Sequence, residues 1–380
     1  MAEIKNLKKT AQRINKAVKK KEKIVLYGDA DLDGIGSVVI LEEAIKNLGG
    51  RVEAVYFPDR ETEGYGLNED ALNYLKKYAP ALLIVLDCGI GNFNEAKLAS
   101  KMGFELVIID HHQPLSKLPQ ASIIVNPKQK GDKYPFKEFA NAGLVFKLIE
   151  TLLKRKLSDS LRDNFLEITA LATIADMMPQ KEDNLEFLAK GIMSLKETAR
   201  PGLKVFWQIL DEDSSRQLVA QKIISACHAG GAQNHINECY LLLTVISNKE
   251  AEALANELLE KSYIRQERIK DIFKEITEKI PTDTSLIFEG NKSWPVLMLG
   301  PVASKLCNTY RKPVFLYKED NSHCQGAVRT PSGVNGVKAM ACCSKLLEIY
   351  GGHPQAAGFR IEKKNLEKFK SCLIKYFKNA

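Results

Sequence analysis

The sequence lacks any long hydrophobic run: no stretch of its 380 residues approaches the ~20 consecutive apolar residues that cross a bilayer, and no signal peptide opens it. None of the eight cysteines forms a C-x-x-C pair, and most lie within apolar patterns. This is typical of reduced core residues and argues against a zinc site or a disulfide frame. Tryptophan occurs only twice, and the aromatic residues lack the spacing of a base-stacking platform. We therefore expect a cytoplasmic chain without a membrane partner.

The composition is that of an ordinary folded chain, with 45% hydrophobic and 27% charged residues, and the length allows two or three domains. The formal net charge of +8 suits a polyanionic substrate, although net charge alone is a weak indicator. Near the N-terminus, apolar residues from Ile4 to Val18 recur at helical spacing among lysines. This pattern predicts an amphipathic helix that docks on the fold. Contact between its basic face and nucleic acid is the alternative interpretation.

One acidic stretch, residues 24–37, predicts a metal site. Its apolar start at residues 24–27 predicts a buried strand, and three carboxylates follow at alternate positions, Asp29, Asp31 and Asp33, before a helical pattern begins. In extended chain, alternate side chains point to one side about 7 Å apart, so divalent cations between them would keep all three ionised. A solvated acidic turn with an Asx-type helix cap is the alternative.

Apolar strands and helical patterns alternate over the first third of the chain. This alternation is typical of a parallel, doubly wound α/β sheet, in which ligands bind at the carboxyl ends of the strands. We expect strands at residues 24–27, 52–57, 82–86, 106–109 and 123–125, and helices at residues 35–48, 68–77 and 94–102.

Further metal-type residues follow the ends of two of these strands. Asp87 follows the third strand, where it could equally cap the next helix. His111 and His112 follow the fourth, and are best explained as one ligand and one substrate-facing acid or anion binder. Asp110 lies between the fourth strand and these two histidines, and we expect it to fix the orientation of a neighbouring ring. Asp176 ends an apolar helical run, where the helix dipole disfavours negative charge, so we expect a cation beside it.

Six motifs occur in one order along the chain: Asp29-x-Asp31-x-Asp33-Gly, Glu63-Gly-Tyr-Gly-Leu67, Asp87-Cys-Gly-Ile, Asp110-His-His, Asn141-Ala-Gly and Ala175-Asp176-x-x-Pro179. In this order they resemble the DHH phosphoesterase superfamily, and within it the RecJ-type single-strand-specific 5′ to 3′ exonucleases. The second and third motifs favour the RecJ type over the shorter oligoribonuclease branch. The resemblance spans nearly the whole chain, from Val25 to Phe359.

The resemblance implies a DHH domain with a doubly wound, mostly parallel sheet, joined by a long helix to a smaller α/β domain of the DHHA1 type, with a catalytic cleft between them. We divide the chain into a DHH catalytic domain with its N-terminal helix (1–195), a helical region with the connecting helix (196–280) and a DHHA1 substrate-binding domain (281–380). Helical periodicity at residues 251–280 predicts the connecting helix. In the last domain we expect strands at residues 296–299, 314–317 and 325–329 and helices at residues 338–349 and 366–377.

The activity implied by the resemblance is metal-dependent hydrolysis of a phosphodiester, in which two divalent ions activate water and stabilise charge on the phosphoryl oxygens. His112 would face the scissile phosphate, with Asp110 beside it in the catalytic set. A mixed imidazole and carboxylate ligand set suits Mn²⁺, with Mg²⁺ a weaker substitute. Carried over residue by residue, the ligands would be Asp33, Asp87, His111 and Asp176 for one ion, and Asp29, Asp31 and a bridging Asp87 for the second.

The resemblance also implies residues that grip the substrate. Gly351, Gly352 and His353 match a glycine-rich signature, in which backbone N–H groups and the imidazole cradle an anion, and a glycine helix C-cap is the alternative. Arg329 falls where the family has an Arg-Ser phosphate clamp, and a surface arginine is the alternative. His228 takes the asparagine position of an Asn-Ala-Gly-Arg-like segment whose arginine is Ala232 here, so one phosphate contact is expected to be missing.

Two more departures from the family pattern bear on function. Tyr27 stands where some relatives have a histidine near the second metal. Bacterial RecJ proteins commonly carry an oligonucleotide-binding fold beyond the point where this chain ends at Ala380. We therefore expect a weaker grip on long single strands and lower processivity.

The sequence thus predicts an end-directed exonuclease of DNA repair or recombination that degrades single-stranded DNA, or RNA, to mononucleotides. It leaves open a replication or repair protein as a further partner. Two alternatives remain: a hydrolase of short oligonucleotides or of nucleotide 3′,5′-bisphosphates, and a non-catalytic replication scaffold that has lost its chemistry.

Overall fold

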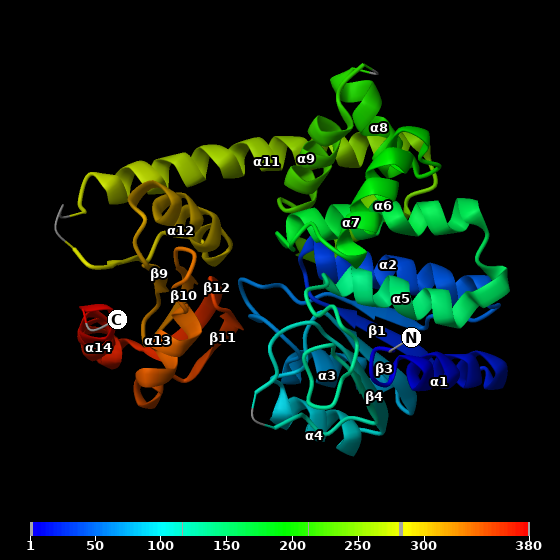
Figure 1. Cartoon of the computed structure of the whole chain (residues 1–380), viewed down its shortest axis with the longest axis horizontal. Helices are drawn as coiled ribbons and strands as arrows, with labels where there is room; N and C mark the ends of the chain where they lie inside the picture. The colour runs from blue at the N-terminus through cyan, green and yellow to red at the C-terminus, as the bar shows by residue number, and fades with distance from the viewer. Residues whose placement is uncertain (1–2, 116, 212, 281–283, 379–380) are drawn as a thin grey trace. The chain divides into compact units, whose positions relative to one another are not determined.

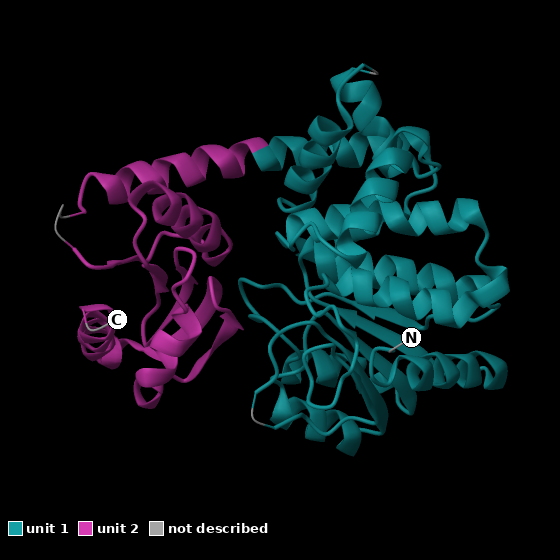
Figure 2. Cartoon of the chain, in the orientation of Figure 1, with its two compact units in different colours: residues 1–262 teal, residues 263–380 magenta. Residues whose placement is uncertain are grey.

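The computed structural model describes residues 3–115, 117–211, 213–280 and 284–378. The chain divides into two compact units, Met1–Ser262 and Tyr263–Ala380, which are coloured separately in Figure 2. Their boundary falls within the long helix α11 (Asn248–Thr277), which confirms the long helix expected in this part of the chain. The division into three parts made from the sequence stays a prediction.

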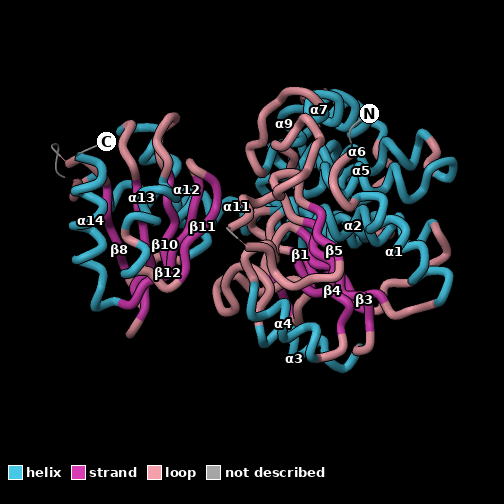
Figure 3. Tube along the Cα trace, turned by 60° about the horizontal axis from the view of Figure 1, so that its bottom comes forward, coloured by secondary structure: helices cyan, strands magenta, loops and turns pink. Residues whose placement is uncertain are grey.

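The first unit is built on a five-stranded sheet with the strand order β2-β1-β3-β4-β5 (Figures 1 and 3). Every neighbouring pair of strands is parallel, so all five carboxyl ends lie at one edge of the sheet. All five strands expected here are confirmed: β1 (Ile24–Gly28), β2 (Ala54–Tyr56), β3 (Ala81–Leu86), β4 (Phe104–Ile109) and β5 (Ile123–Val125).

Helices cover both faces of this sheet, which confirms the doubly wound architecture. Along β1, Ile24 and Leu26 join one apolar cluster while Val25 and Tyr27 join another, because successive strand residues point to opposite faces. The first cluster includes residues of α1 (Leu7–Lys20), α2 (Leu32–Asn47) and α5 (Asn141–Leu153), and the second includes residues of α3 (Glu69–Leu75) and α4 (Phe93–Lys101). The N-terminal helix therefore docks through its apolar face, as predicted.

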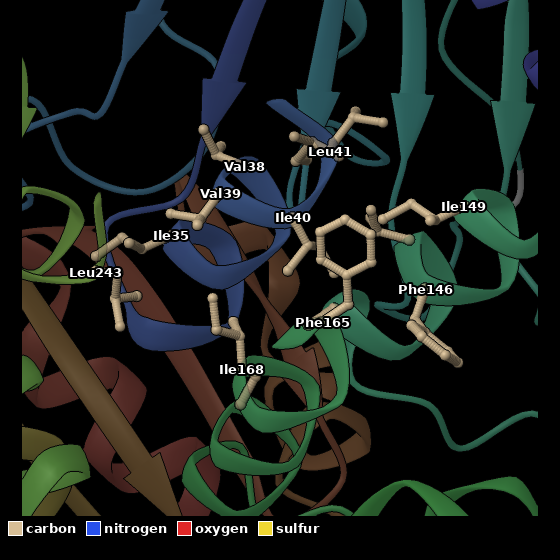
Figure 4. Packing of buried hydrophobic residues seen from close by; sticks show 14 of the residues in the cluster. Ile35, Val38, Val39, Ile40, Leu41, Phe146, Ile149, Phe165, Ile168 and Leu243 are labelled. Carbon is tan, nitrogen blue, oxygen red and sulfur yellow. The ribbon is translucent and has the colours of Figure 1, made fainter. Parts of the chain in front are cut away.

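Helices α2 and α6 (Asp159–Ala175) pack directly against each other, and each carries a predicted metal ligand at or next to one of its ends, Asp33 on α2 and Asp176 after α6. Figure 4 shows Ile35 and other apolar residues of α2 beside Phe165 and Ile168 of α6. A Cβ on Gly36 would lie only 2.8 Å from Ile168 Cγ2, so the glycine permits this close approach. The N-terminus of α2 and the C-terminus of α6 are thereby held in a fixed relation.

The rest of the first unit is mainly helical, as expected for this part of the chain. A short hairpin, β6 (Ala232–Gln233) and β7 (Ile236–Asn237), was not anticipated. Within the described residues, no helix combines the length and apolar character needed to span a bilayer. The helices are α7 (Asp183–Ser194), α8 (Pro201–Leu210), α9 (Arg216–Cys227), α10 (Glu238–Thr244) and the first part of α11.

The second unit contains a mixed sheet with the strand order β11-β12-β10-β9-β8, in which only the β8–β9 pair is parallel. Its strands are β8 (Ile287–Asn291), β9 (Val314–Glu319), β10 (His323–Arg329), β11 (Ile349–His353) and β12 (Ala356–Glu362). Its helices are the end of α11, α12 (Val296–Tyr310), α13 (Gly336–Cys342) and α14 (Leu366–Lys378).

Two expectations for this unit are wrong. The strand expected at residues 296–299 is the first turn of α12, because Leu299, Val302 and Leu306 place their buried side chains on one helical face. The helix expected at residues 338–349 ends at Cys342, and Ile349 already begins β11. The strands expected at residues 314–317 and 325–329 and the last helix are confirmed as β9, β10 and α14.

The cysteines require another correction. Cys343 and Cys372 form a disulfide, so the expectation that all eight are reduced is wrong for this pair. The bond joins two cysteines that lie 29 residues apart in sequence, one at the end of α13 and one in α14, and these two helices pack together in the fold. Neither residue type nor local periodicity reveals such a long-range pairing. The other six are free, and five of them are buried as expected, while Cys342 is exposed.

Candidate metal centre

The predicted ligands of the first unit converge at the carboxyl edge of the parallel sheet. Asp29 follows β1, Asp87 follows β3 and His111 follows β4 by one residue. Asp87 has a φ of 63°, a left-handed conformation uncommon outside glycine, asparagine and aspartate, so the chain turns sharply directly after β3. It does not cap the next helix, since α4 begins only at Phe93.

His111 lies at the centre of the first group of ligands. Its Nε2 is 3.2 Å from Asp87 Oδ1, 3.6 Å from Asp176 Oδ2 and 3.8 Å from Asp33 Oδ2. Ligand atoms of Asp33, Asp87 and His111 all lie within 4.8 Å of one another, and all three residues are buried. The sequence therefore predicted correctly that these four side chains, from distant segments, meet.

The hydrogen bonding of His111 shows why this group fits a cation. Nδ1 lies 2.7 Å from the carbonyl oxygen of Phe139, which can only accept, so Nδ1 carries a proton. In the neutral ring, Nε2 then turns its lone pair toward three carboxylates. A histidine oriented by a backbone carbonyl is the usual arrangement of a metal ligand.

Buried oxygen atoms in this group also indicate a cation. Among the described residues, Asp87 Oδ1 and Asp176 Oδ2 are buried side-chain oxygens that accept no hydrogen bond. Burial, followed by the negative charge of neighbouring aspartates, raises the pKa of Asp33 and of Asp87 well above the usual range. Burial and the charge of Asp31 raise the pKa of Asp176 to about 7. A divalent ion would satisfy these oxygens and remove the repulsion, so the residues present fit a bound metal.

Asp33 is held by helix ends rather than by extended chain. It lies in the first turn of α2, and its oxygens accept hydrogen bonds from the backbone N–H groups of Asn141 (2.6 Å) and Ala142 (2.8 Å) at the start of α5. Asp31 is the N-cap of α2 and accepts from the N–H groups of Asp33 and Gly34, both at 3.1 Å. The extended spacing inferred from the sequence is therefore wrong, because α2 begins at Leu32. Asp31 therefore acts as an Asx-type cap of α2 and also lies among the candidate metal ligands, so the two interpretations do not exclude each other.

Asp29, Asp31 and Asp87 form a second group whose ligand atoms lie within 4.8 Å of one another. The sequence reasoning missed a fourth member, Arg60, whose guanidinium forms ion pairs with Asp29 and Asp31. Burial opposes ionisation of Asp31, but the charge of Arg60 and the hydrogen bond from Gly34 outweigh it and lower its pKa. Arg60 lies in the loop after β2, a strand end to which no functional residue had been assigned.

His112 forms a separate hydrogen-bonded group beside the ligands. Its Nδ1 lies 2.8 Å from Asp110 Oδ1, and its backbone N–H donates to the same oxygen at 2.9 Å. Asp110 also accepts from the N–H of Ile90 and is fully buried. Burial disfavours the charged ring, but the carboxylate of Asp110 outweighs it and raises the pKa of His112 to about 9. The expectation that Asp110 orients a neighbouring ring is confirmed, and its carboxylate favours the charged form of His112.

Three other residues complete the surroundings of the site. His228 lines a pocket together with Asp31 and Asp176, so it lies next to the ligands as its predicted substrate role requires. The hydroxyl of Tyr65 donates to the carbonyl of Asp87 and lies 3.2 Å from His112 Nδ1. Tyr27 is buried, and its hydroxyl donates to the carbonyl of Gly66. Tyr27 therefore has a structural partner at the position where some relatives have a histidine.

The predicted substrate-binding residues of the second unit lie at one end of its sheet. Arg329 and His353 are both paired with Ala356 of β12, so they occupy one row about 10 Å apart. The Arg329 guanidinium donates from Nε to Ser304 Oγ at 3.0 Å and from one terminal nitrogen to the Val328 carbonyl at 2.9 Å. Gly351 and Gly352 lie in β11 and not at a helix C-cap, and Gly352 has a φ of 127°. The anion-binding roles of these residues stay predictions.

Comparison with known proteins gives two domain matches. Residues 23–173 match the DHH family, N-terminal domain, and residues 283–379 match the DHHA1 domain. The chain is 33% identical over 379 residues to the single-stranded-DNA-specific exonuclease RecJ of Bacillus subtilis, covering 98% of this chain and 48% of that protein. It is 28% identical to the RecJ exonuclease of Thermus thermophilus, covering 98% of this chain and 54% of that one. The chain thus spans about half the length of these relatives.

Solved structures share the fold. The crystal structure of Thermus thermophilus RecJ in complex with Mn²⁺ superposes with a TM-score of 0.84 at 24% identity, covering 99% of this chain and 55% of that chain. A crystal structure of exonuclease RecJ bound to manganese gives a TM-score of 0.80 at 26% identity, covering 100% of this chain and 96% of that chain. The parallel sheet, the long helix and the smaller mixed sheet are therefore a known arrangement of elements.

Proposed function

The chain carries a DHH-family N-terminal domain followed by a DHHA1 domain, and we propose that it is a metal-dependent exonuclease that hydrolyses single-stranded DNA from the 5′ end to mononucleotides. The support from known proteins is the printed activity of the RecJ relatives, two of which match 98% of this chain. The observation that carries the proposal is the meeting of Asp33, Asp87, His111 and Asp176, with buried oxygens that accept no hydrogen bond among the described residues.

Asp33, Asp87, His111 and Asp176 would hold one divalent ion, and Asp29, Asp31 and Asp87 the second. Bound there, the two ions would activate water and stabilise charge on the phosphoryl oxygens. Imidazole together with carboxylates favours Mn²⁺ over Mg²⁺, which prefers oxygen ligands. A related exonuclease RecJ, at 26% identity, was solved bound to manganese, which supports this choice.

The remaining residues of the site act directly on the substrate in this proposal. His112, held in one orientation and kept charged by Asp110, donates a hydrogen bond to an oxygen of the scissile phosphate. His228 contacts the substrate from the same pocket as Asp31. In the second unit, Arg329, Gly351, Gly352 and His353 bind a phosphate of the strand, which makes the enzyme end-directed. Their common place at one end of the sheet supports this role.

Degradation assays test the proposed function. End-labelled single-stranded DNA and blunt duplex DNA are incubated separately with the chain and Mn²⁺, with Asp87→Asn as the inactive control. The proposal predicts release of mononucleotides from the single strand alone, beginning at its 5′ end. Equal digestion of both substrates, or equal activity of the variant, would contradict it. Activity confined to oligonucleotides of two to five residues would instead favour the short-oligonucleotide hydrolase.

We also propose that the enzyme acts in the cytoplasm in DNA repair or recombination, together with a replication or repair protein. The support is the single-stranded DNA specificity printed for its relatives, since such strands arise during those processes. Fractionation of cells that express the tagged chain tests the compartment, and recovery outside the cytoplasm would contradict it. Cross-linking in the same cells after DNA damage tests the partner.

A further inference from the structure

Arg60 reaches from the loop after β2 into the second group of carboxylates. Its Nε donates to Asp29 Oδ1 at 3.1 Å, and one terminal nitrogen, Nη2, lies 2.9 Å from Asp31 Oδ2 and also contacts Asp29 Oδ2. Asp29 is 1% exposed, whereas the Arg60 side chain is 26% exposed. The arginine therefore enters from the more open side and covers a buried carboxylate.

One oxygen of each aspartate, Oδ2, contacts the same terminal nitrogen of Arg60, Nη2. Asp29 Oδ1 accepts from the N–H of Ala30 at 2.8 Å, and Asp31 Oδ1 accepts from the N–H groups at the start of α2. The remaining oxygen of each, Oδ2, faces Arg60 Nη2. A divalent ion ligated by both Oδ2 atoms would have to stand close to where this nitrogen stands. Two cations cannot share that position.

We propose that Arg60 and the second divalent ion compete for Asp29 and Asp31, so that the second ion binds only when Arg60 is displaced. This inference rests on the proposed two-ion function and adds a sequence of events to it. Among the described residues, the ion pairs of Asp33, Asp87 and Asp176 are with histidines and not with an arginine or lysine, so we expect the first ion to bind more tightly. The two ions therefore bind with unequal affinities.

The displaced guanidinium has other partners. In the paired state its Cζ already lies 5.9 Å from the centre of the Tyr65 ring, so an aromatic surface is within reach of a displaced side chain. A planar guanidinium also matches the geometry of phosphate oxygens. A substrate phosphate that takes the arginine would free both carboxylates for the ion. Substrate and second ion should then bind cooperatively through Arg60, because each favours the same displaced state.

Calorimetric titration of the whole chain with Mn²⁺ tests the competition. The wild-type chain should show one tight binding event and a second, weaker one, and two events of equal affinity would contradict the inference. In Arg60→Ala, the second event should tighten by about tenfold or more while the first is unchanged, since loss of one charge-assisted ion pair has at least that effect on an equilibrium. Arg155→Ala is the matched control, because Arg155 is exposed in another part of the unit. It should titrate like wild type.

The outcomes separate the inference from the proposed function. Unchanged affinities in Arg60→Ala, or loss of its second event, would overturn the competition and leave the two-ion hydrolase intact. No Mn²⁺ binding by the wild-type chain would remove the proposed function itself. Arg60→Gln, which keeps a polar side chain, repeats the test should Arg60→Ala not fold by circular dichroism. Thymidine 5′-monophosphate should tighten the second event in wild type by a larger factor than in either variant, and an equal factor would contradict the role of Arg60.

Discussion

Nε2 of His111 lies 3.2 Å from Oδ1 of Asp87, at the ends of two neighbouring parallel strands. The opposite ring nitrogen is bound to the Phe139 carbonyl, so the ring cannot turn away without losing that hydrogen bond. Two further carboxylates, of Asp33 and Asp176, lie within 3.8 Å of the same nitrogen. The fold thus holds one imidazole nitrogen and three acids together, an arrangement that a divalent cation would stabilise.

Replacing Asp87 by asparagine should abolish hydrolysis. Asp87 belongs to both groups of ligands, so Asp87→Asn weakens the binding of both ions. Loss of a residue that hydrogen-bonds to a metal ligand typically lowers metal affinity or activity by about 10–100-fold. Loss of the proposed ligand Asp87 itself should therefore reduce the rate by more than 100-fold. Mn²⁺ titration and rates on single-stranded DNA measure both effects. Asp271→Asn, at an exposed position, is the control and should behave like wild type. Full activity of Asp87→Asn would refute the ligand assignment.

Replacing Asp110 by asparagine should lower the pKa of His112 from about 9 toward its ordinary value of 6.5, because the carboxylate that stabilises the charged ring is removed. The histidine is then mostly neutral at pH 8. We expect the rate at pH 8 to fall by about 100-fold, with a smaller loss at pH 6, where the ring is again charged. NMR titration of the imidazole gives the pKa, and pH profiles give the rates. A His112 pKa that stays near 9 would contradict the account.

Binding of Mn²⁺ should release protons below neutral pH. The pKa of Asp176 is about 7 because burial and neighbouring charge disfavour its ionised form, whereas a ligand must be ionised. Affinity should therefore rise with pH between pH 5.5 and 7, by about tenfold per pH unit for each proton released. Calorimetry in buffers of different ionisation enthalpy counts the protons. Affinity independent of pH over this interval would show that these carboxylates are already ionised.

A buried carboxylate outside the site should make stability depend on pH. Glu167 is 1% exposed, and burial raises its pKa to about 7 although Thr198 and Ser194 donate hydrogen bonds to it. An acid that binds its proton more tightly when folded stabilises the fold at low pH. That contribution is lost as pH rises from about 4.5 through 7.

We therefore expect the free energy of unfolding of wild type to fall by roughly 2–3 kcal/mol between pH 5 and 8 relative to Glu167→Gln, which cannot ionise. Urea unfolding at several pH values measures the difference. Glu252→Gln removes an exposed carboxylate and should follow wild type. Parallel pH profiles for Glu167→Gln and wild type would show that Glu167 ionises as readily in the folded chain as in the unfolded one.

The sequence predicted which side chains meet at the carboxyl edge because a parallel sheet converts order along the chain into position in space. Once strands end before Asp29, Asp87 and His111, their side chains must meet at one edge. The same rule would have pointed to Arg60, since it follows β2, but an arginine is not a metal ligand and so attracted no attention. No comparable rule predicted the geometry of Asp31 and Asp33, because α2 begins at Leu32 and helix capping replaces the extended spacing.

Errors were concentrated in the second unit, where the sheet is mixed and local pattern decides less. The apolar residues at 296–299 fit a strand when taken alone, and only their continuation to Leu306 reveals a helix. The glycines at 351 and 352 suggest a loop or helix cap, yet pairing with β12 draws them into a strand. The Cys343–Cys372 bond likewise depends on contacts between distant elements. Long-range contacts determined the last two features.

Anomalous diffraction from crystals of the whole chain soaked in Mn²⁺ with thymidine 5′-monophosphate tests the central claim most directly. We predict an anomalous peak at about 2.0–2.3 Å from side-chain atoms of Asp33, Asp87, His111 and Asp176, the distance typical of first-row divalent metals bound by nitrogen and oxygen. A crystal with no Mn²⁺ peak among these four residues would contradict the assignment of this site as a metal-dependent phosphodiesterase centre.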